Sequence, residues 1–244
     1  MKVTPAWREW GRTALGLLYP GICPVCRTEV FPKGAPGRFC RNCRQEIVRI
    51  RPPFCRICCE PFPGEITSSF VCPRCSGWKY SFDFAVSPAL SRGPVRETIH
   101  RFKYGSDITL RRPLARLMRS ALLDPRLKGV PWLLVPVPLH PRRERERQFN
   151  QSVELARSLA SLTGLRWLPA LKRILFTESQ AGLEREKRLQ NLKGAFAIHR
   201  PVKDREILLI DDVFTTGATA EECARVLKRD GGARRVAVLT AARG

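Results

Sequence analysis

Apolar runs and helix-like repeats alternate along the chain between residues 81 and 244. The apolar runs typical of buried parallel strands are Leu133–Val135, Ile207–Ile210 and Val236–Leu239. Apolar residues recur at helical spacing over Phe149–Leu162 and again over Thr219–Leu227. Because strands alternate with helices, the pattern predicts an α/β domain with a parallel sheet, and a ligand is expected at the carboxyl ends of its strands.

The first 80 residues lack this alternation. Apolar residues at helical spacing stop at Pro20, which predicts a short amphipathic helix over residues 1–19 that serves packing rather than export. No stretch approaches the roughly 20 apolar residues that a membrane-spanning helix needs, so no membrane span is expected. Since no export signal is evident, we expect a cytoplasmic protein whose thiols stay reduced.

The composition is that of a folded and strongly basic protein. Hydrophobic residues make up 43% of the 244 residues and charged residues 27%, which excludes wholesale disorder, a collagen-like repeat and a membrane bundle. The formal net charge is +22 at pH 7, more basic than the surface of an ordinary metabolic enzyme. Such a charge favours a polyanionic partner.

Eight of the ten cysteines form four CxxC pairs with a duplicated spacing. Two pairs separated by thirteen residues form one set, and the second set repeats the first at a period of 32 residues. Two CxxC turns supply the tetrahedral four-sulfur shell that Zn2+ prefers. The predicted ligands of two structural zinc ions are Cys23, Cys26, Cys40, Cys43, Cys55, Cys58, Cys72 and Cys75.

Other interpretations of these cysteines are buried or disulfide-bonded thiols and an iron–sulfur cluster. Spacing leaves open whether each set closes on its own ion or the pairs alternate, although duplication favours self-contained units. The apolar residues between the ligands are too few for a core without metal, so folding and zinc binding should be one event. We therefore divide the chain into a helix over residues 1–19, a double zinc ribbon over residues 20–80 and a larger domain over residues 81–244.

The zinc region also combines positive charge with aromatic rings. Residues 1–80 contain 13 Lys and Arg against 5 Asp and Glu. The interleaved residues are Phe39, Phe54, Phe70, Trp78 and Tyr80 with Arg38, Arg41, Arg56, Arg74 and Lys79. This mixture suits single-stranded nucleic acid, whose phosphates meet cations while its bases stack on rings, although small zinc domains also expose rings by default.

The predicted strand Ile207–Ile210 is followed by two adjacent acids, Asp211 and Asp212, and by a hydroxyl-rich turn. Buried carboxylates need hydroxyls, cations or water as partners. The turn contains Gly217, which can adopt unusual dihedral angles, and backbone N–H groups at the start of the following helix would face an anion. Acids beside such a phosphate cradle predict a sugar phosphate ligand; the alternative is an Asp-capped helix preceded by a solvent-facing acid.

The segment Ile207–Thr219 resembles the signature of type I phosphoribosyltransferases. The resemblance implies that Asp211 and Asp212 are the catalytic pair, which holds the ribose hydroxyls of phosphoribosyl pyrophosphate and places Mg2+. It implies that the 5-phosphate is bound by Thr215, Thr216, Gly217, Ala218 and Thr219. With the CxxC region in front, nearly the whole chain resembles the ComF/GntX-like competence family, which joins a double zinc ribbon to a phosphoribosyltransferase-like parallel sheet with helices on both faces.

Further segments are similar to that family. Residues 135–151 resemble its pyrophosphate loop, in which Arg142 and Arg143 would bind phosphate oxygens through their guanidinium forks. Acids among these arginines also fit an exposed helix start, and Gln148 stands where the family pattern has a glycine. Lys103 resembles the element that opens the domain and is a further substrate-binding candidate. The residues that resemble the mobile loop over the site are Arg173, Thr177, Gln180, Leu183, Arg188, Asn191 and Phe196.

Two functions follow from these features. The first is a competence-type protein of DNA uptake that binds single-stranded DNA, contacts the uptake machinery and binds phosphoribosyl pyrophosphate or a nucleotide. The alternative is an active Mg2+-dependent phosphoribosyltransferase whose acceptor no residue identifies and whose zinc ribbons deliver substrate. Because residues 81–244 are also basic, with 31 Lys and Arg against 17 Asp and Glu, the charge favours the first function.

Overall fold

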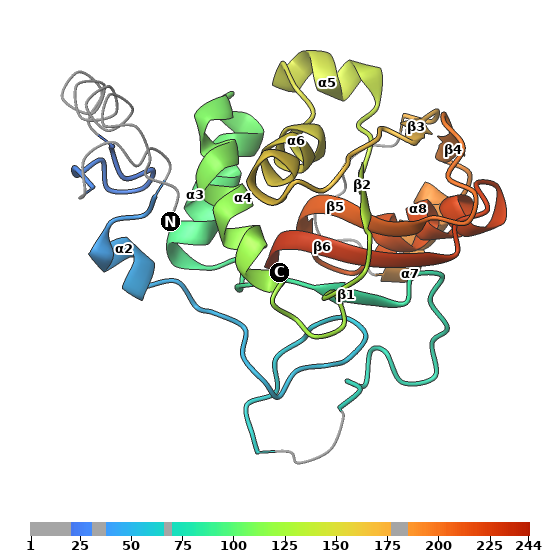
Figure 1. Ribbon diagram of the computed structural model, residues 1–244, viewed down its shortest axis with the longest axis horizontal. Helices are drawn as coiled ribbons and strands as arrows, with labels where there is room; N and C mark the ends of the chain where they lie inside the picture. Colours follow the sequence, from blue (N-terminus) through green and yellow to red (C-terminus); the bar gives the residue numbers. More distant parts are fainter. Residues whose placement is uncertain (1–20, 31–37, 66–69, 177–184) are drawn as a thin grey trace, which may run out of the picture.

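The computed structural model describes residues 21–30, 38–65, 70–176 and 185–244 (Figure 1). The helix predicted over residues 1–19 lies outside the described residues. So do three residues of the predicted mobile loop, Thr177, Gln180 and Leu183.

Four parallel strands form the central sheet, as the alternating pattern predicts. They are β1 (Phe84–Val86), β2 (Leu133–Pro136), β5 (Glu206–Phe214) and β6 (Arg235–Arg243). The order across the sheet is β1-β6-β5-β2, and each neighbouring pair is parallel. The interior strands β5 and β6 are almost wholly buried, which explains why they appear in the sequence as apolar runs rather than alternating patterns.

Helices cover both faces of the sheet (Figure 1). The first face packs against α3 (Gly93–Tyr104), α4 (Arg111–Ala121) and α6 (Gln151–Thr163), and the second against α8 (Ala218–Arg229). Leu208 and Ile210 of β5 belong to the first core, whereas Ile207 and Leu209 belong to the second. Two cores arise because consecutive strand residues point to opposite faces, and the predicted α/β class is confirmed.

Smaller elements surround this framework. A 3-10 helix (Ile108–Leu110) leads into α4, and α5 (Pro141–Arg147) follows β2. An antiparallel pair, β3 (Leu171–Arg173) and β4 (Phe196–Ile198), lies beside α8, and α7 (Arg185–Leu192) packs against α8. In the zinc region, the described helix is α2 (Arg41–Gln45).

The structure corrects the predicted end of β5. We expected the strand to end at Ile210 and the two acids to lie in a loop, but β5 continues through both acids to Phe214. The extension forms because β6 also continues, pairing Asp211 with Thr240 and Phe214 with Arg243. The following helix begins at Ala218, one residue before the predicted start, and Gly217 occupies the N-cap position in a left-handed conformation that glycine adopts readily.

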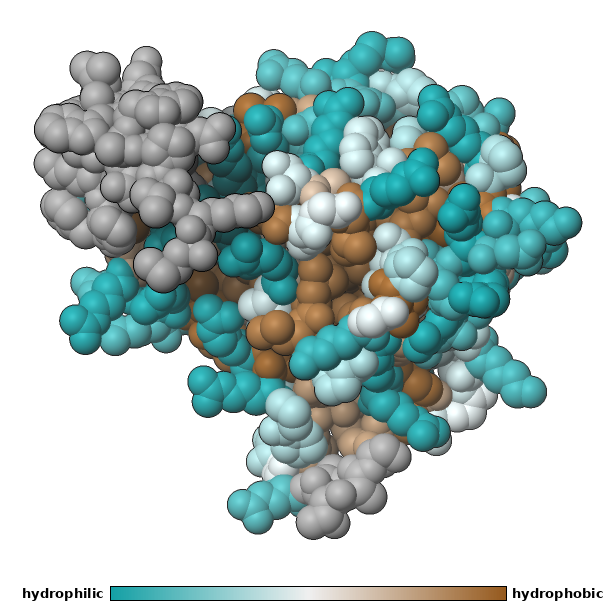
Figure 2. Space-filling view, viewed as in Figure 1, coloured by the Kyte–Doolittle hydropathy of each residue, from teal (hydrophilic) through white to brown (hydrophobic). Residues whose placement is uncertain are grey.

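The outer surface mixes polar and apolar areas. Figure 2 shows hydrophilic side chains around most of the rim of one face, with a hydrophobic strip near its middle. None of the helices in the described part of the chain is both long and apolar enough to span a bilayer.

Candidate functional site

The cysteines form two separate clusters, and each cluster closes within its own repeat. The sulfur atoms of Cys23, Cys26, Cys40 and Cys43 all lie within 4.8 Å of one another, and those of Cys55, Cys58, Cys72 and Cys75 do the same. Four thiolates about 2.3 Å from one Zn2+ have Sγ atoms about 3.8 Å apart. The Sγ atoms of Cys26 and Cys40 are 3.5 Å apart and those of Cys58 and Cys72 are 3.6 Å apart, so both clusters fit structural zinc.

The geometry repeats with the same 32-residue period as the sequence. The backbone N–H of Cys40 donates to Cys23 Sγ at 3.4 Å, and that of Cys72 donates to Cys55 Sγ at 3.4 Å. Antiparallel bridges join Ile22 to Glu29 in one repeat and Phe54 to Pro61 in the other. Of the two arrangements that the spacing left open, the structure therefore has the tandem one, with two self-contained ribbons.

The two ribbons differ in their surroundings. We call residues 21–47 the first ribbon and residues 53–78 the second ribbon. The first ribbon has a small core of its own around Cys23, Val30 and Cys43, with Cys26 exposed. The four predicted zinc ligands of the second ribbon are all buried, and they belong to the core that also contains Phe82 and Phe214. The second ribbon thus shares a core with the α/β domain, whereas the first ribbon keeps a small core of its own and contacts the domain through Phe39 and Ile47.

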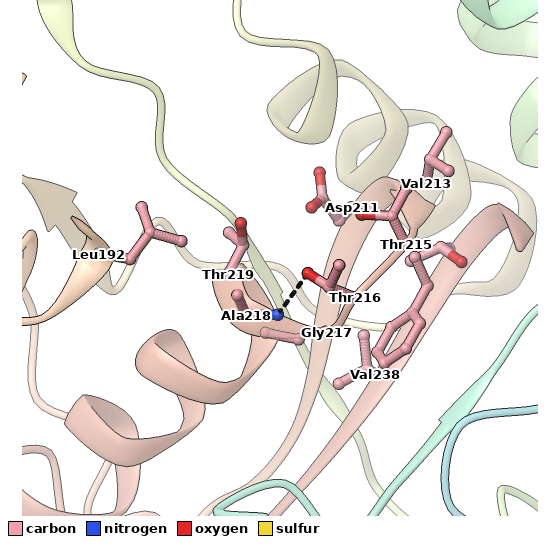
Figure 3. Close-up of a pocket in the computed structure, with 12 residues that line it drawn as sticks. Leu192, Asp211, Val213, Thr215, Thr216, Gly217, Ala218, Thr219 and Val238 are labelled. Carbon is pink, nitrogen blue, oxygen red and sulfur yellow. Dashed lines mark hydrogen bonds between the residues drawn. The ribbon is translucent and has the colours of Figure 1, made fainter. Parts of the chain in front are cut away.

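The loop between β5 and α8 encloses a cavity of about 60 Å³ (Figure 3). Thr216 Oγ1 accepts a hydrogen bond from the backbone N–H of Ala218 at 3.4 Å. Gly217 has φ of 83°, and a Cβ there would come within 2.8 Å of the Phe214 ring, so only glycine fits this turn without rearrangement. Figure 3 shows Asp211 and Thr219 beside the loop, with Leu192 of α7 across the cavity. Backbone N–H groups at the start of α8 make this cavity suitable for an anion.

The two acids of β5 have different partners. Asp211 Oδ1 accepts hydrogen bonds from the Ser152 hydroxyl at 3.0 Å and from the backbone N–H of Asp212 at 2.9 Å. Burial and the neighbouring charge of Asp212 raise the pKa of Asp211 to about 7. Sequence reasoning missed Ser152, because its contact with Asp211 spans 59 residues and no local pattern reports it.

Lys103 of α3 meets the second acid. Its Nζ lies 2.8 Å from Asp212 Oδ1, and both groups are largely buried. Although burial by itself lowers the pKa of Lys103, the charge of Asp212 and their hydrogen bond raise it above its usual value. The structure thus places Lys103 beside Asp212, whose charge it compensates, and its role in binding substrate stays a prediction.

The arginines predicted to bind diphosphate lie on α5, which is exposed on its outer side. Arg142 pairs with Glu146 at 3.4 Å and stacks on Phe176, with its guanidinium carbon 4.8 Å from the ring centre. The side chain of Arg143 is partly buried, whereas that of Arg142 is exposed. Burial and the charge of Arg143 lower the pKa of Arg173, while Asp211 opposes this effect, so these three residues are electrostatic neighbours. The alternative interpretation of this segment, an exposed helix start, is therefore also met by α5, whose Arg143 is an electrostatic neighbour of Asp211.

The second ribbon contacts the candidate phosphate loop through one buried arginine. Arg243, at the end of β6, pairs with Glu60 of the ribbon and donates a hydrogen bond to the carbonyl of Phe214 at 3.2 Å. The ring of Phe82 packs edge-on against Phe214 at 5.8 Å. Because Phe214 is the last residue of β5 and directly precedes the loop, the ribbon helps to hold the start of the loop in place.

Four of the five rings proposed to stack on bases are partly buried. Phe39 packs against the first main core, and Tyr80 stacks on Phe82 with ring centres 4.5 Å apart. Among the five rings proposed to stack on bases, Trp78 is the exposed one, at 40%. Arg41 is exposed as well.

Comparison with known proteins finds a matching family for the zinc region and remote similarity to two solved structures. Residues 14–76 match the family described as Double zinc ribbon domain. Among solved structures, the allosteric regulatory enzyme of purine biosynthesis is similar with a TM-score of 0.37 and 17% identity, covering 58% of this chain and 29% of that chain. A glutamine mutant of an HPRT is similar with a TM-score of 0.27 and 15% identity, covering 57% of this chain and 79% of that chain.

Relatives of similar length match almost the whole chain. The DNA utilization protein YhgH of Salmonella typhi is 33% identical over 221 residues, covering 89% of this chain and 95% of the relative. Competence protein F of Haemophilus influenzae is 31% identical, covering 86% of this chain and 91% of the relative. Competence protein ComFC of Bacillus subtilis is 28% identical, covering 92% of this chain and 96% of the relative. At this identity and coverage, with its zinc ribbons in front of an α/β sheet, the chain belongs to the ComF/GntX-like competence family.

Proposed function

We propose that this protein handles single-stranded DNA during uptake and binds phosphoribosyl pyrophosphate with Mg2+ at the loop between β5 and α8. The observation that carries the ligand proposal is the meeting of Asp211, Asp212 and Lys103 beside an anion-binding helix start. Carboxylates are ligands that Mg2+ accepts, and they also accept hydrogen bonds from ribose hydroxyls.

Each group in the site has a role in this proposal. Asp211 and Asp212 hold the ribose hydroxyls and Mg2+, and residues 215–219 bind the 5-phosphate through backbone N–H groups and hydroxyls. Lys103, Arg142 and Arg143 neutralise the diphosphate. If the bound ligand reacts, Mg2+ would neutralise the negative charge that develops on the leaving diphosphate.

The DNA part of the proposal rests on charge and on the relatives. A net charge of +22 is spread over both parts of the chain, and relatives carry the names competence protein and DNA utilization protein. Trp78 offers an exposed ring, and Arg41 an exposed cation. We propose that the protein is cytoplasmic and works with the DNA-uptake machinery. We also propose that its chain divides into a double zinc ribbon over residues 20–80 and a larger domain over residues 81–244.

A titration of phosphoribosyl pyrophosphate into the full-length protein tests the ligand site. Calorimetry with and without Mg2+ measures binding, and a pyrophosphate assay on the same samples measures turnover. We expect Mg2+-dependent binding, and no binding in either condition would refute the ligand site. Binding without pyrophosphate release supports a binding protein, whereas sustained release in the presence of candidate acceptors favours the transferase alternative.

A further inference from the structure

A second and larger cavity lies between the amino-terminal part of α4 and the outer face of α6. Its volume is about 500 Å³, within the range of roughly 300–1,000 Å³ that is usual for ligand sites. Its lining includes Arg111, Arg112 and Arg116 of α4 together with Glu154 and Arg157 of α6. None of these residues lines the cavity between β5 and α8.

The charges in this cavity are unbalanced. Glu154 is the acid in its lining, and it lies 3.3 Å from Arg111 and 3.1 Å from Arg157. Four arginines therefore face one carboxylate. Burial, followed by the charges of Arg38, Arg112 and Arg119, lowers the pKa of Arg116, so cations crowd this side chain. An anion placed among them would relieve this repulsion.

The chemistry of the lining favours phosphate among anions. Guanidinium forks bind phosphate oxygens through two parallel hydrogen bonds, and Ser158 and Ser161 add hydroxyl donors from α6. Glu154 holds Arg111 and Arg157 in fixed directions, so less side-chain freedom is lost when a ligand binds.

The arginines of the cavity lie near the first ribbon. Arg38, just before the ligand Cys40, is close enough to Arg116 to affect its charge equilibrium. Arg101 of α3 donates a hydrogen bond to the carbonyl of Pro24 in the ribbon and pairs with Asp107 at 3.1 Å, directly before the 3-10 helix that leads into α4. A strand whose phosphates meet the arginines of the cavity could thus extend toward Arg38 of the first ribbon.

We infer that the cavity between α4 and α6 binds backbone phosphates of a single DNA strand whose neighbouring nucleotides contact the first ribbon. This inference rests on the proposed function and adds to it a second contact region, on the α/β domain. The same phosphate chemistry would also accept a free nucleotide, and the test below distinguishes the two sources.

The test compares three full-length variants in binding to fluorescent oligo(dT) and to dTMP. Arg112→Gln/Arg116→Gln removes two cavity charges, and Ser161→Glu adds a repelling carboxylate at an exposed helix position. Arg200→Gln/Lys203→Gln removes two exposed charges elsewhere and serves as the matched control. Thermal unfolding and zinc content of each variant verify that it is folded.

We expect the cavity double variant to bind oligo(dT) about tenfold more weakly than the control. Its salt dependence should fall by about 1.4 in the slope of log K against log salt, because two phosphate contacts are lost. Ser161→Glu should weaken binding without removing an arginine.

Three outcomes would overturn the inference, and they can be told apart. If the cavity variants and the control bind oligo(dT) equally, the inference is wrong and the proposed DNA function stands. If the cavity variants lose only dTMP binding, the cavity holds a free nucleotide instead of a strand. If the wild-type protein does not bind oligo(dT), the proposed DNA function is wrong and the inference fails with it.

Discussion

Asp211 and Asp212 are neighbours in sequence but have different environments, because consecutive residues of a strand point in opposite directions. Asp212 is paired with Lys103 at 2.8 Å, whereas Asp211 relies on the neutral hydroxyl of Ser152. The result is one charge-compensated carboxylate and one with a pKa near 7. Adjacent groups with different ionisation suit a site that holds both a cation and sugar hydroxyls.

The first prediction concerns these two acids. Asp211→Asn/Asp212→Asn keeps their size and removes the charges that place Mg2+ and accept ribose hydroxyls. The affinity for phosphoribosyl pyrophosphate should fall by about 2 kcal/mol or more, the scale of hydrogen bonds to charged groups. Calorimetry measures this change, with Asp204→Asn/Asp230→Asn as a control of equal charge. An unchanged affinity in the site variant would contradict the assignment.

The second prediction concerns stability and pH. The pKa of Asp211 is raised from 3.8 to about 7, so the folded protein binds this proton more tightly than the unfolded chain does. The stability linked to this group is therefore present at low pH and is lost as the pH rises from about 4 to about 7. Asp211→Asn should be more stable than the wild type at pH 8, by up to about 4 kcal/mol, and similar to it near pH 4. Denaturant unfolding at pH 4 and pH 8 measures the free energy of unfolding of the variant and the wild type. If the variant differs from the wild type by the same amount at both pH values, the raised pKa of Asp211 is refuted.

At the scale of the element, the two ribbons have the same internal geometry but different contacts. Both present four sulfur atoms at zinc-ligand distances. The second ribbon also shares a core with the α/β domain and contacts the loop through Glu60 and Arg243. Loss of metal should therefore have local effects in the first ribbon and wider effects in the second.

The third prediction separates the two ribbons. The purified protein should contain two zinc ions per chain, and Cys40→Ser and Cys72→Ser should each lose one. Cys40→Ser should disorder the first ribbon and leave the affinity for phosphoribosyl pyrophosphate unchanged. Cys72→Ser should lower that affinity and the unfolding temperature, because it disturbs the support of Phe214. Elemental analysis, calorimetry and thermal unfolding measure these effects.

Two results would contradict this prediction. Absence of zinc, or the visible absorbance of an iron–sulfur cluster, would rule out the assigned metal. Equal effects of the two substitutions on ligand affinity would show that the contact between Glu60 and Arg243 does not support the loop.

At the scale of the whole molecule, the packing changes how DNA binding has to be tested. Removal of residues 1–80 would delete not only a peripheral arm but also the buried cysteines of the second ribbon, which contribute to the main core. A loss of DNA binding after such a truncation would then reflect unfolding as much as lost contacts. Point substitutions on the full-length protein avoid this problem.

The fourth prediction is that single-stranded DNA binds without strong sequence preference, mainly on the zinc region. Arg41→Ala and Arg74→Ala should lower both the affinity and its salt dependence, because each removes a cation that can meet phosphate. Trp78→Ala should lower the affinity by about 1–3 kcal/mol and leave the salt dependence nearly unchanged, because it removes stacking alone. Fluorescence anisotropy at several salt concentrations measures both, with Arg229→Ala as a control. Affinity independent of salt would contradict the phosphate contacts.

Local sequence was enough to predict the α/β class, the two cysteine sets and the loop after β5. Buried parallel strands require apolar runs, tetrahedral zinc requires CxxC pairs, and the left-handed turn at Gly217 requires glycine. These demands act on neighbouring residues, so they leave a pattern that can be recognised without a structure.

Tertiary structure alone decided which distant residues meet. The extension of β5 through its acids depends on pairing with β6, and the pKa of Asp211 depends first on burial and then on Lys103 and Ser152. The core shared by the second ribbon and the α/β domain, and the separate small core of the first ribbon, likewise come from packing between remote segments. Such contacts are set by how whole elements fill space around the sheet, and no spacing along the chain encodes them.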